Sequence, residues 1–195
     1  RDVAEAARWY ERAAEAGNAV AQNRYAKLLA VGEGVDGFSV GDRVASNGPH
    51  AEVVMAPKNL AARIPDEVAN DQAVFTVVGA IGLQGVRLLQ PTLGETFAVF
   101  GLGLIGLLGV QILKAHGARV IGFDFDAGRV ELARSFGAQA ENLSQGADPV
   151  AMALAATREM GVDGVLVTAA TKSDQLMHQA AQMCRRRGRI VLTGV

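Results

Sequence analysis

Cysteine is nearly absent from this chain, and so are long apolar runs and any excess of charge of one sign. The single cysteine, Cys184, excludes a disulfide within the chain and a zinc cage built from several thiolates. The sequence contains no run of about 18 apolar residues, the length that a helix needs to cross a membrane. No signal peptide is visible. Nineteen Lys and Arg against 20 Asp and Glu give a net charge of −1, which provides no attraction to nucleic acid. These absences predict a globular cytoplasmic protein without a nucleic-acid or membrane partner. Because its first residue is Arg1 instead of Met, we expect a fragment of a longer protein or a processed chain.

The most informative motif follows an apolar strand predicted at Thr96–Phe100. It is Gly101-Leu102-Gly103-Leu104-Ile105-Gly106, with the spacing G-x-G-x-x-G and a helix predicted to begin within it. The first glycine permits a tight turn, the second lets the backbone approach a pyrophosphate, and the third lets the helix pack on the strand. The helix N-terminus directs unpaired N–H groups at the phosphates. The alternative is a glycine-rich turn that only packs tightly.

A second apolar strand, 119–123, ends on Asp124, 18 residues after Gly106. A carboxylate at this position can accept hydrogen bonds from both ribose hydroxyls and would repel a 2′-phosphate, which favours NAD over NADP. Strand, glycines, helix, strand and acid in this order predict a dinucleotide site.

Strands and helices alternate along the chain beyond Gly94. The expected strands are 96–100, 119–123, 140–143, 163–169 and 189–192, and the expected helices are 104–116, 127–136, 149–160 and 174–187. Repeated βα units of this length build an α/β fold, a doubly wound parallel Rossmann sheet. We expect the strand order 3-2-1-4-5, with the sixth strand of the full fold missing. The unpaired edge of the fifth strand then invites a homodimer or aggregation.

Two segments of different character precede this region. Residues 1–35 are Ala-rich and predict an α-hairpin, in which Gly17-Asn18 ends the first helix and the second carries Ala21, Tyr25, Leu28 and Leu29. Residues 36–66 predict short strands near 42–45 and 51–55. A glycine-containing helical stretch over 68–89 follows them.

Several motifs resemble the medium-chain dehydrogenase/reductase superfamily, that of the zinc-type alcohol dehydrogenases. The matching segments are 37–44, 48–52, 57–60, 64–66, 79–81, 84–87 and 101–106. The resemblance runs from about 31 to 195 and is close to members joined to a second oxidoreductase domain. It implies a remnant of a GroES-like barrel at 36–66 and a C-terminally truncated NAD-binding Rossmann domain at 67–195. It also implies hydride transfer between nicotinamide and an alcohol or carbonyl substrate.

The first 35 residues resemble a different family. Trp9-Tyr10, Ala13-Ala14, Gly17-Asn18 and Ala21-Gln22 are similar to a single Sel-like repeat, a relative of the tetratricopeptide repeat. Such repeats normally stack, so the hairpin at 1–35 is expected to pack on its neighbour or to bind a protein partner. The junction suggests a chimera.

Zinc is not expected in this chain. In zinc-dependent relatives a His-Glu pair and a later Cys act as ligands. By spacing they would fall near Gln22-Asn23 and near Thr76, which cannot replace them.

The resemblance assigns further roles, each with a simpler alternative. Thr76 and Val78 would line the nicotinamide pocket or only pack a helix, and Arg129 would cover the adenine ribose or stay solvated. Thr168, Ala169 and Ala170, with Gly194-Val195 farther on, would lie near the nicotinamide ribose.

No catalytic residue emerges from the sequence. His50 would lie near a cofactor or act in proton transfer, or it is a surface histidine at a strand edge. His116 and His178 have no nucleophile or acid at readable spacing, and Cys184 is expected to be a buried thiol. The arginine run at 185–189 is interpreted as a solvated helix C-terminus and not as an anion-binding patch. We therefore expect an NAD-dependent oxidoreductase whose catalytic half is incomplete. The alternative is a non-catalytic dinucleotide-binding fragment or an interaction module.

Overall fold

The computed structural model describes residues 26–28, 36–39, 41–48, 54, 56–171 and 173–193. The chain divides into two compact units, Arg1–Val77 and Val78–Val195. Within the described residues, each unit has a sheet and an apolar core of its own. No helix among these residues is long and apolar enough to cross a bilayer.

The first unit contains a three-stranded antiparallel sheet in the order β1-β2-β3. Its strands are β1 (Ala26–Leu28), β2 (Arg43–Ser46) and β3 (Ala61–Arg63), with the 3-10 turn η1 (Lys58–Leu60) before β3 and the short helix α2 (Asn70–Ala73) after it. Ala45, Ile64 and Ala73 form a small core. The Arg43 guanidinium joins β2 to the start of α2, because Nη2 donates to the carbonyl oxygen of Val68 and to Asn70 Oδ1, both at 2.6 Å.

β1 corrects one part of the prediction for residues 1–35. Ala26, Lys27 and Leu28 fall within the expected second helix of the hairpin, yet they form a strand that pairs antiparallel with β2. Alanine and leucine are strong helix formers, but intrinsic propensity is a small free energy that pairing with a neighbouring strand overrides. The rest of the expected hairpin lies outside the described residues, as does most of the expected strand at 51–55.

The second unit is built on a five-stranded parallel sheet in the order β6-β5-β4-β7-β8. Its strands are β4 (Thr96–Phe100), β5 (Arg119–Asp124), β6 (Gln139–Asn142), β7 (Val162–Val167) and β8 (Cys184–Leu192). Its helices are α3 (Thr76–Leu89, of which Val78 onward belongs to this unit), α4 (Leu104–Ala115), α5 (Ala127–Ser135), α6 (Pro149–Ala156) and α7 (Gln175–Met183), with the 3-10 turn η2 (Leu143–Gln145). Counted along the chain, the strand order is the predicted 3-2-1-4-5.

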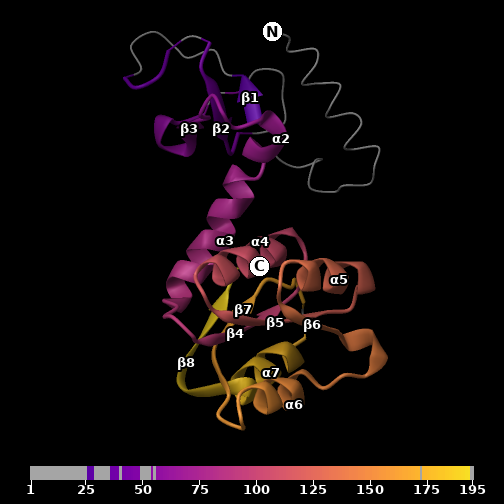
Figure 1. Ribbon diagram of the computed structural model, residues 1–195. Coiled ribbons are helices and arrows are strands. Elements are labelled where there is room, and N and C mark those ends of the chain that lie inside the picture. Colours follow the sequence, from indigo (N-terminus) through magenta and orange to yellow (C-terminus); the bar gives the residue numbers. More distant parts are fainter. Residues whose placement is uncertain are drawn as a thin grey trace. The chain divides into compact units, whose positions relative to one another are not determined.

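Helices cover both faces of this sheet, with α4 and α5 on one face and α6 and α7 on the other (Figure 1). Successive side chains of β4 divide between the two cores. Phe97 and Val99 pack with α3, α4 and α5, whereas Ala98 and Phe100 pack with α6 and α7. Because both faces are covered, every residue of β4 is buried, and its sequence is almost continuously apolar.

The end of α7 corrects a second expectation. The predicted helix over 174–187 stops at Met183, and Cys184 begins β8. The side chain of Arg185 contacts two carboxylates. Its Nε donates to Asp163 Oδ1 at 2.6 Å, and its Nη2 lies 3.5 Å from Glu95 Oε1. β8 bulges between Cys184 and Arg189. These two residues pair with Val162 and Gly164, which are only two positions apart in β7. The arginine run is therefore not a helix C-terminus.

Candidate dinucleotide-binding site

The turn between β4 and α4 shows why two of its three glycines are needed by the fold. Gly101 has φ +85°, and a Cβ there would lie 2.7 Å from the backbone nitrogen of Ala169. A Cβ at Gly106 would collide with the carbonyl oxygen of Gly101. Either substitution would require the backbone to shift, since backbone atoms cannot move aside as a flexible side chain can.

Gly103 is different, because the fold makes no such demand on it. A Cβ built on Gly103 would meet no atom within 4 Å, and its φ of −66° is open to any residue. Gly103 is also the N-cap of α4 and has no side-chain cap. First-turn N–H groups of a helix have no intrahelical partner, so they face this open space and can bind an anion. The turn thus fits a pyrophosphate.

Asp124 holds the other side of the turn. It ends β5, is 8% exposed, and accepts a hydrogen bond from the backbone N–H of Leu102 at Oδ2 (2.6 Å) and from that of Asp126 at Oδ1 (2.9 Å). A carboxylate offers about four lone pairs, so capacity remains for two ribose hydroxyls. The contact with Leu102 was not predicted. It could have been found from the sheet, because adjacent parallel strands end at the same edge and Gly101 N–H bonds to the Phe123 carbonyl at 2.9 Å.

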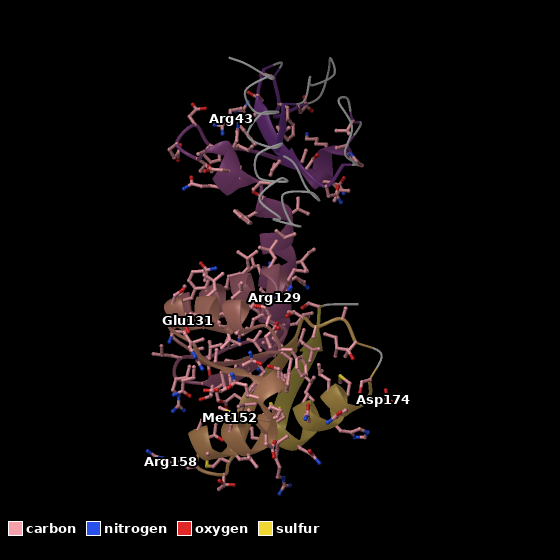
Figure 2. The ribbon with its side chains drawn as sticks, turned by 90° about the vertical axis from the view of Figure 1, so that its right-hand side faces the viewer. Arg43, Arg129, Glu131, Met152, Arg158 and Asp174 are labelled. Atoms are coloured by element: carbon pink, nitrogen blue, oxygen red, sulfur yellow. The ribbon has the colours of Figure 1, made fainter. Side chains whose placement is uncertain are left out.

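Arg129 lies beside this carboxylate. It stands in the first turn of α5, is labelled in Figure 2, and its Nη1 is 3.8 Å from Asp124 Oδ2. Its side chain is 54% exposed, so the guanidinium is within reach of a ligand from the solvent side.

Residues following β7 pack against the glycine turn from the opposite side. The Thr168 N–H donates to the Phe100 carbonyl oxygen at 2.8 Å, and the Thr168 hydroxyl donates to the Gly101 carbonyl oxygen at 2.5 Å. Ala169 lies against Gly101 so closely that only glycine fits there. The structure therefore brings Gly101, Leu102, Asp124, Thr168 and Ala169 together, with Leu104 and Ile105 in the first turn of α4.

Several other candidates are not placed in this group. Thr76 belongs to the first unit, where its exposed side chain donates to the Ala73 carbonyl oxygen at 2.7 Å, so a role at nicotinamide stays a prediction. His116 Nε2 is 3.0 Å from the Pro91 carbonyl oxygen, and His178 is exposed on α7. Burial raises the pKa of the Cys184 thiol, which makes it a poor nucleophile at neutral pH. His50 and Gly194-Val195 lie outside the described residues.

Among the residues that the structure describes, no three His, Cys, Asp or Glu residues are grouped so that they could hold a metal ion.

Comparison with known proteins shows which families and proteins this chain resembles. Residues 105–195 match the family model described as zinc-binding dehydrogenase. The (R,R)-butanediol dehydrogenase of Bacillus subtilis strain 168 is 28% identical over 197 residues, which are 87% of this chain and 56% of that protein. Residues 105–195 thus resemble the zinc-type alcohol dehydrogenases.

The chain is also similar to solved structures of dehydrogenases. The crystal structure of 2R,3R-butanediol dehydrogenase from Bacillus subtilis matches with a TM-score of 0.73 and 27% identity, over 85% of this chain and 55% of that one. A protein from Escherichia coli CFT073, described as a short chain alcohol dehydrogenase complexed with the cofactor NADH, matches with a TM-score of 0.69 and 29% identity, over 83% and 56% of the two chains. The chain spans about half the length of the relatives it matches.

Proposed function

We propose that this chain binds NAD(H) and forms the cofactor-binding part of an oxidoreductase that transfers a hydride between nicotinamide and an alcohol or carbonyl carbon. The observation that carries the proposal is the open space over Gly103, in a turn whose other glycines are fixed by packing. Relatives named as alcohol and butanediol dehydrogenases support the reaction class.

Different residues around the turn would bind different parts of the cofactor. Gly103 and the first turn of α4 would bind the pyrophosphate, and Asp124 would bind the adenosine ribose. Arg129 would cover the solvent side of that ribose. Thr168 and Ala169 would border the nicotinamide half. The bound nicotinamide would supply the hydride acceptor or donor, while this chain binds and orients it.

NAD is preferred over NADP in this proposal. A 2′-phosphate adds about −1.5 to −2 charges and would approach the buried carboxylate of Asp124 at the ribose position. Like charges repel strongly where water is excluded. Asp126, whose N–H bonds to Asp124, adds a second carboxylate nearby.

Hydride transfer is further proposed to proceed without a zinc of the family type. The support is the sequence, which has Gln22-Asn23 and Thr76 at the positions of a His-Glu pair and a cysteine ligand. Metal analysis of the purified chain tests this proposal. One zinc ion bound per chain would contradict it.

The wider organisation expected from the sequence is also part of the proposal. It consists of a Sel-like helical segment at 1–35 with a protein partner, a barrel remnant at 36–66, and the NAD-binding domain at 67–195. We place the protein in the cytoplasm, on the strength of its single cysteine. A homodimer would form through the outer edge of β8.

Binding of ADP-ribose, which carries the pyrophosphate and adenosine without nicotinamide, tests the cofactor proposal directly. Gly103→Ala places a methyl group where the phosphates would lie, so we expect its Kd, measured by calorimetry, to rise at least tenfold. Gly79→Ala is the matched control, because Gly79 also has no atom within 4 Å of a built Cβ and stands in α3. Absence of heat with the unchanged chain at millimolar ADP-ribose would overturn the proposal.

A second assay separates an enzyme from a binding module. We expect NAD reduction with at least one member of a panel of alcohols and sugars. A chain that binds ADP-ribose and reduces no NAD with any of them would favour the non-catalytic alternative.

A further inference from the structure

We infer that Thr168 is a positioning residue that, together with Asp124, locks the peptide plane between Gly101 and Leu102 so that the turn presents N–H groups to the phosphates. This inference rests on the proposed NAD(H) site. Thr168 would then act by holding the backbone of the turn, and not by contacting the nicotinamide half of the cofactor.

The two ends of one peptide unit are held from opposite sides. The carbonyl oxygen of Gly101 accepts the Thr168 hydroxyl at 2.5 Å, and the N–H of Leu102 donates to Asp124 Oδ2 at 2.6 Å. A peptide unit is planar, so two hydrogen bonds at its two ends fix its rotation about the chain direction. Thr168 comes from the end of β7 and Asp124 from the end of β5, the two strands that flank β4.

This peptide needs such a restraint because it follows a glycine. Gly101 has φ +85°, and glycine adopts positive and negative φ about equally well. A flip of the plane would turn the Gly101 carbonyl oxygen away from Thr168 and the Leu102 N–H away from Asp124. A carbonyl dipole facing the pyrophosphate would repel it, whereas N–H groups attract it.

The single hydroxyl hydrogen of Thr168 is already used in this contact. Its Oγ1 is 2.5 Å from the Gly101 oxygen and 3.0 Å from the Phe100 oxygen, so both possible acceptors are backbone carbonyls of the turn. A hydroxyl has one hydrogen to donate, so no donor remains for a cofactor. The same oxygen would lie 2.8 Å from a Cβ at Gly106, which places Thr168 against the start of α4 as well.

Thr168→Val tests the hydroxyl with little change in shape. We expect its Kd for ADP-ribose to rise about tenfold, because the Gly101 carbonyl loses its partner and the peptide can flip. Thr168→Ser keeps the donor, and its Kd should stay within twofold of the unchanged chain. The fold should persist in both, since the backbone bond from Thr168 N–H to Phe100 remains.

Thr157→Val is the matched control for loss of a threonine hydroxyl. Its Oγ1 donates to the Ala153 carbonyl oxygen at 2.7 Å at the end of α6, so we expect lower stability and an unchanged Kd. Thr168→Ala provides a second variant without steric strain and should bind as weakly as Thr168→Val.

Three results would overturn the inference while leaving the NAD(H) proposal intact. The first is a Thr168→Val chain that binds ADP-ribose as tightly as the unchanged chain. The second is a Thr168→Ser chain that binds as weakly as Thr168→Val. The third is loss of circular dichroism in both Thr168→Val and Thr168→Ala, which would make the role one of stability. Failure of the unchanged chain to bind counts against the proposed function itself.

Discussion

Asp124 meets two demands with one carboxylate. It accepts the buried N–H of Leu102 and the N–H of Asp126, and it is the proposed acceptor for the ribose diol. The first task belongs to the fold and the second to the ligand. A change at this residue therefore alters both stability and binding, and the control must separate them.

Asp124→Asn is expected to shift the choice between NADH and NADPH. The amide removes the negative charge that repels a 2′-phosphate but keeps one oxygen acceptor. We expect the ratio of Kd for NADPH to Kd for NADH to fall at least tenfold, measured by the fluorescence of the bound nicotinamide. Asp148→Asn is the control, because Asp148 Oδ1 also accepts two backbone N–H groups, those of Val150 and Ala151. An unchanged ratio in Asp124→Asn would remove the charge argument for NAD.

Strands β4, β7 and β8 are joined at one end of the sheet by polar contacts that the sequence did not indicate. Asp163 in β7 accepts the Thr96 N–H at Oδ2 (2.7 Å) and the Arg185 Nε at Oδ1 (2.6 Å). Through these bonds, one carboxylate holds the start of β4 and the bulge of β8. Arg185, the first residue of the arginine run, is held in the sheet by this contact.

Asp163→Ala is expected to lower the free energy of unfolding by about 2 kcal/mol, because the N–H of the buried Thr96 loses its acceptor and Arg185 loses one of its two carboxylate partners. Urea unfolding followed by circular dichroism measures the change. Glu131→Ala is the matched control, since Glu131, labelled in Figure 2, pairs with Arg134 at 3.5 Å on an exposed helix face. Exposed pairs contribute about 0–1 kcal/mol. Equal losses in the two variants would show that Asp163 does not hold these strands together.

At the scale of the whole molecule, the groups proposed to bind the adenosine and the pyrophosphate all belong to the second unit. Gly103, Asp124, Arg129 and Thr168 lie after Val78, whereas the antiparallel sheet of β1, β2 and β3 belongs to the first unit. A ligand without nicotinamide should therefore change only the second unit.

Hydrogen exchange with and without ADP-ribose tests that separation. We expect slower exchange in peptides covering the glycine turn, the β5–α5 connection and the end of β7, because bound ligand suppresses local opening. Peptides from β2 and β3 should exchange at the same rate in both states. Protection of β2 and β3 equal to that of the turn would show that the adenosine half binds elsewhere.

The glycine spacing and the alternation of apolar segments were sufficient to predict the parallel sheet, its strand order and the position of the turn. Both are local signals, because a turn with positive φ requires glycine and a buried strand requires apolar residues wherever they occur. The limits of β4 agree with the sequence to the residue, and those of α4 and β5 to within one residue.

Only the tertiary structure decided the features that depend on partners far along the chain. Ala26–Leu28 became a strand because β2 lies beside it, and Cys184 began a strand because Asp163 binds Arg185. The bonds of Asp124 to Leu102 and of Thr168 to Gly101 join residues 22 and 67 positions apart. The sequence by itself determined which residues form the turn, since the positive φ of Gly101 is a local requirement for glycine. The structure decided which groups hold it in place, because hydrogen-bond partners are brought together only when the strands align.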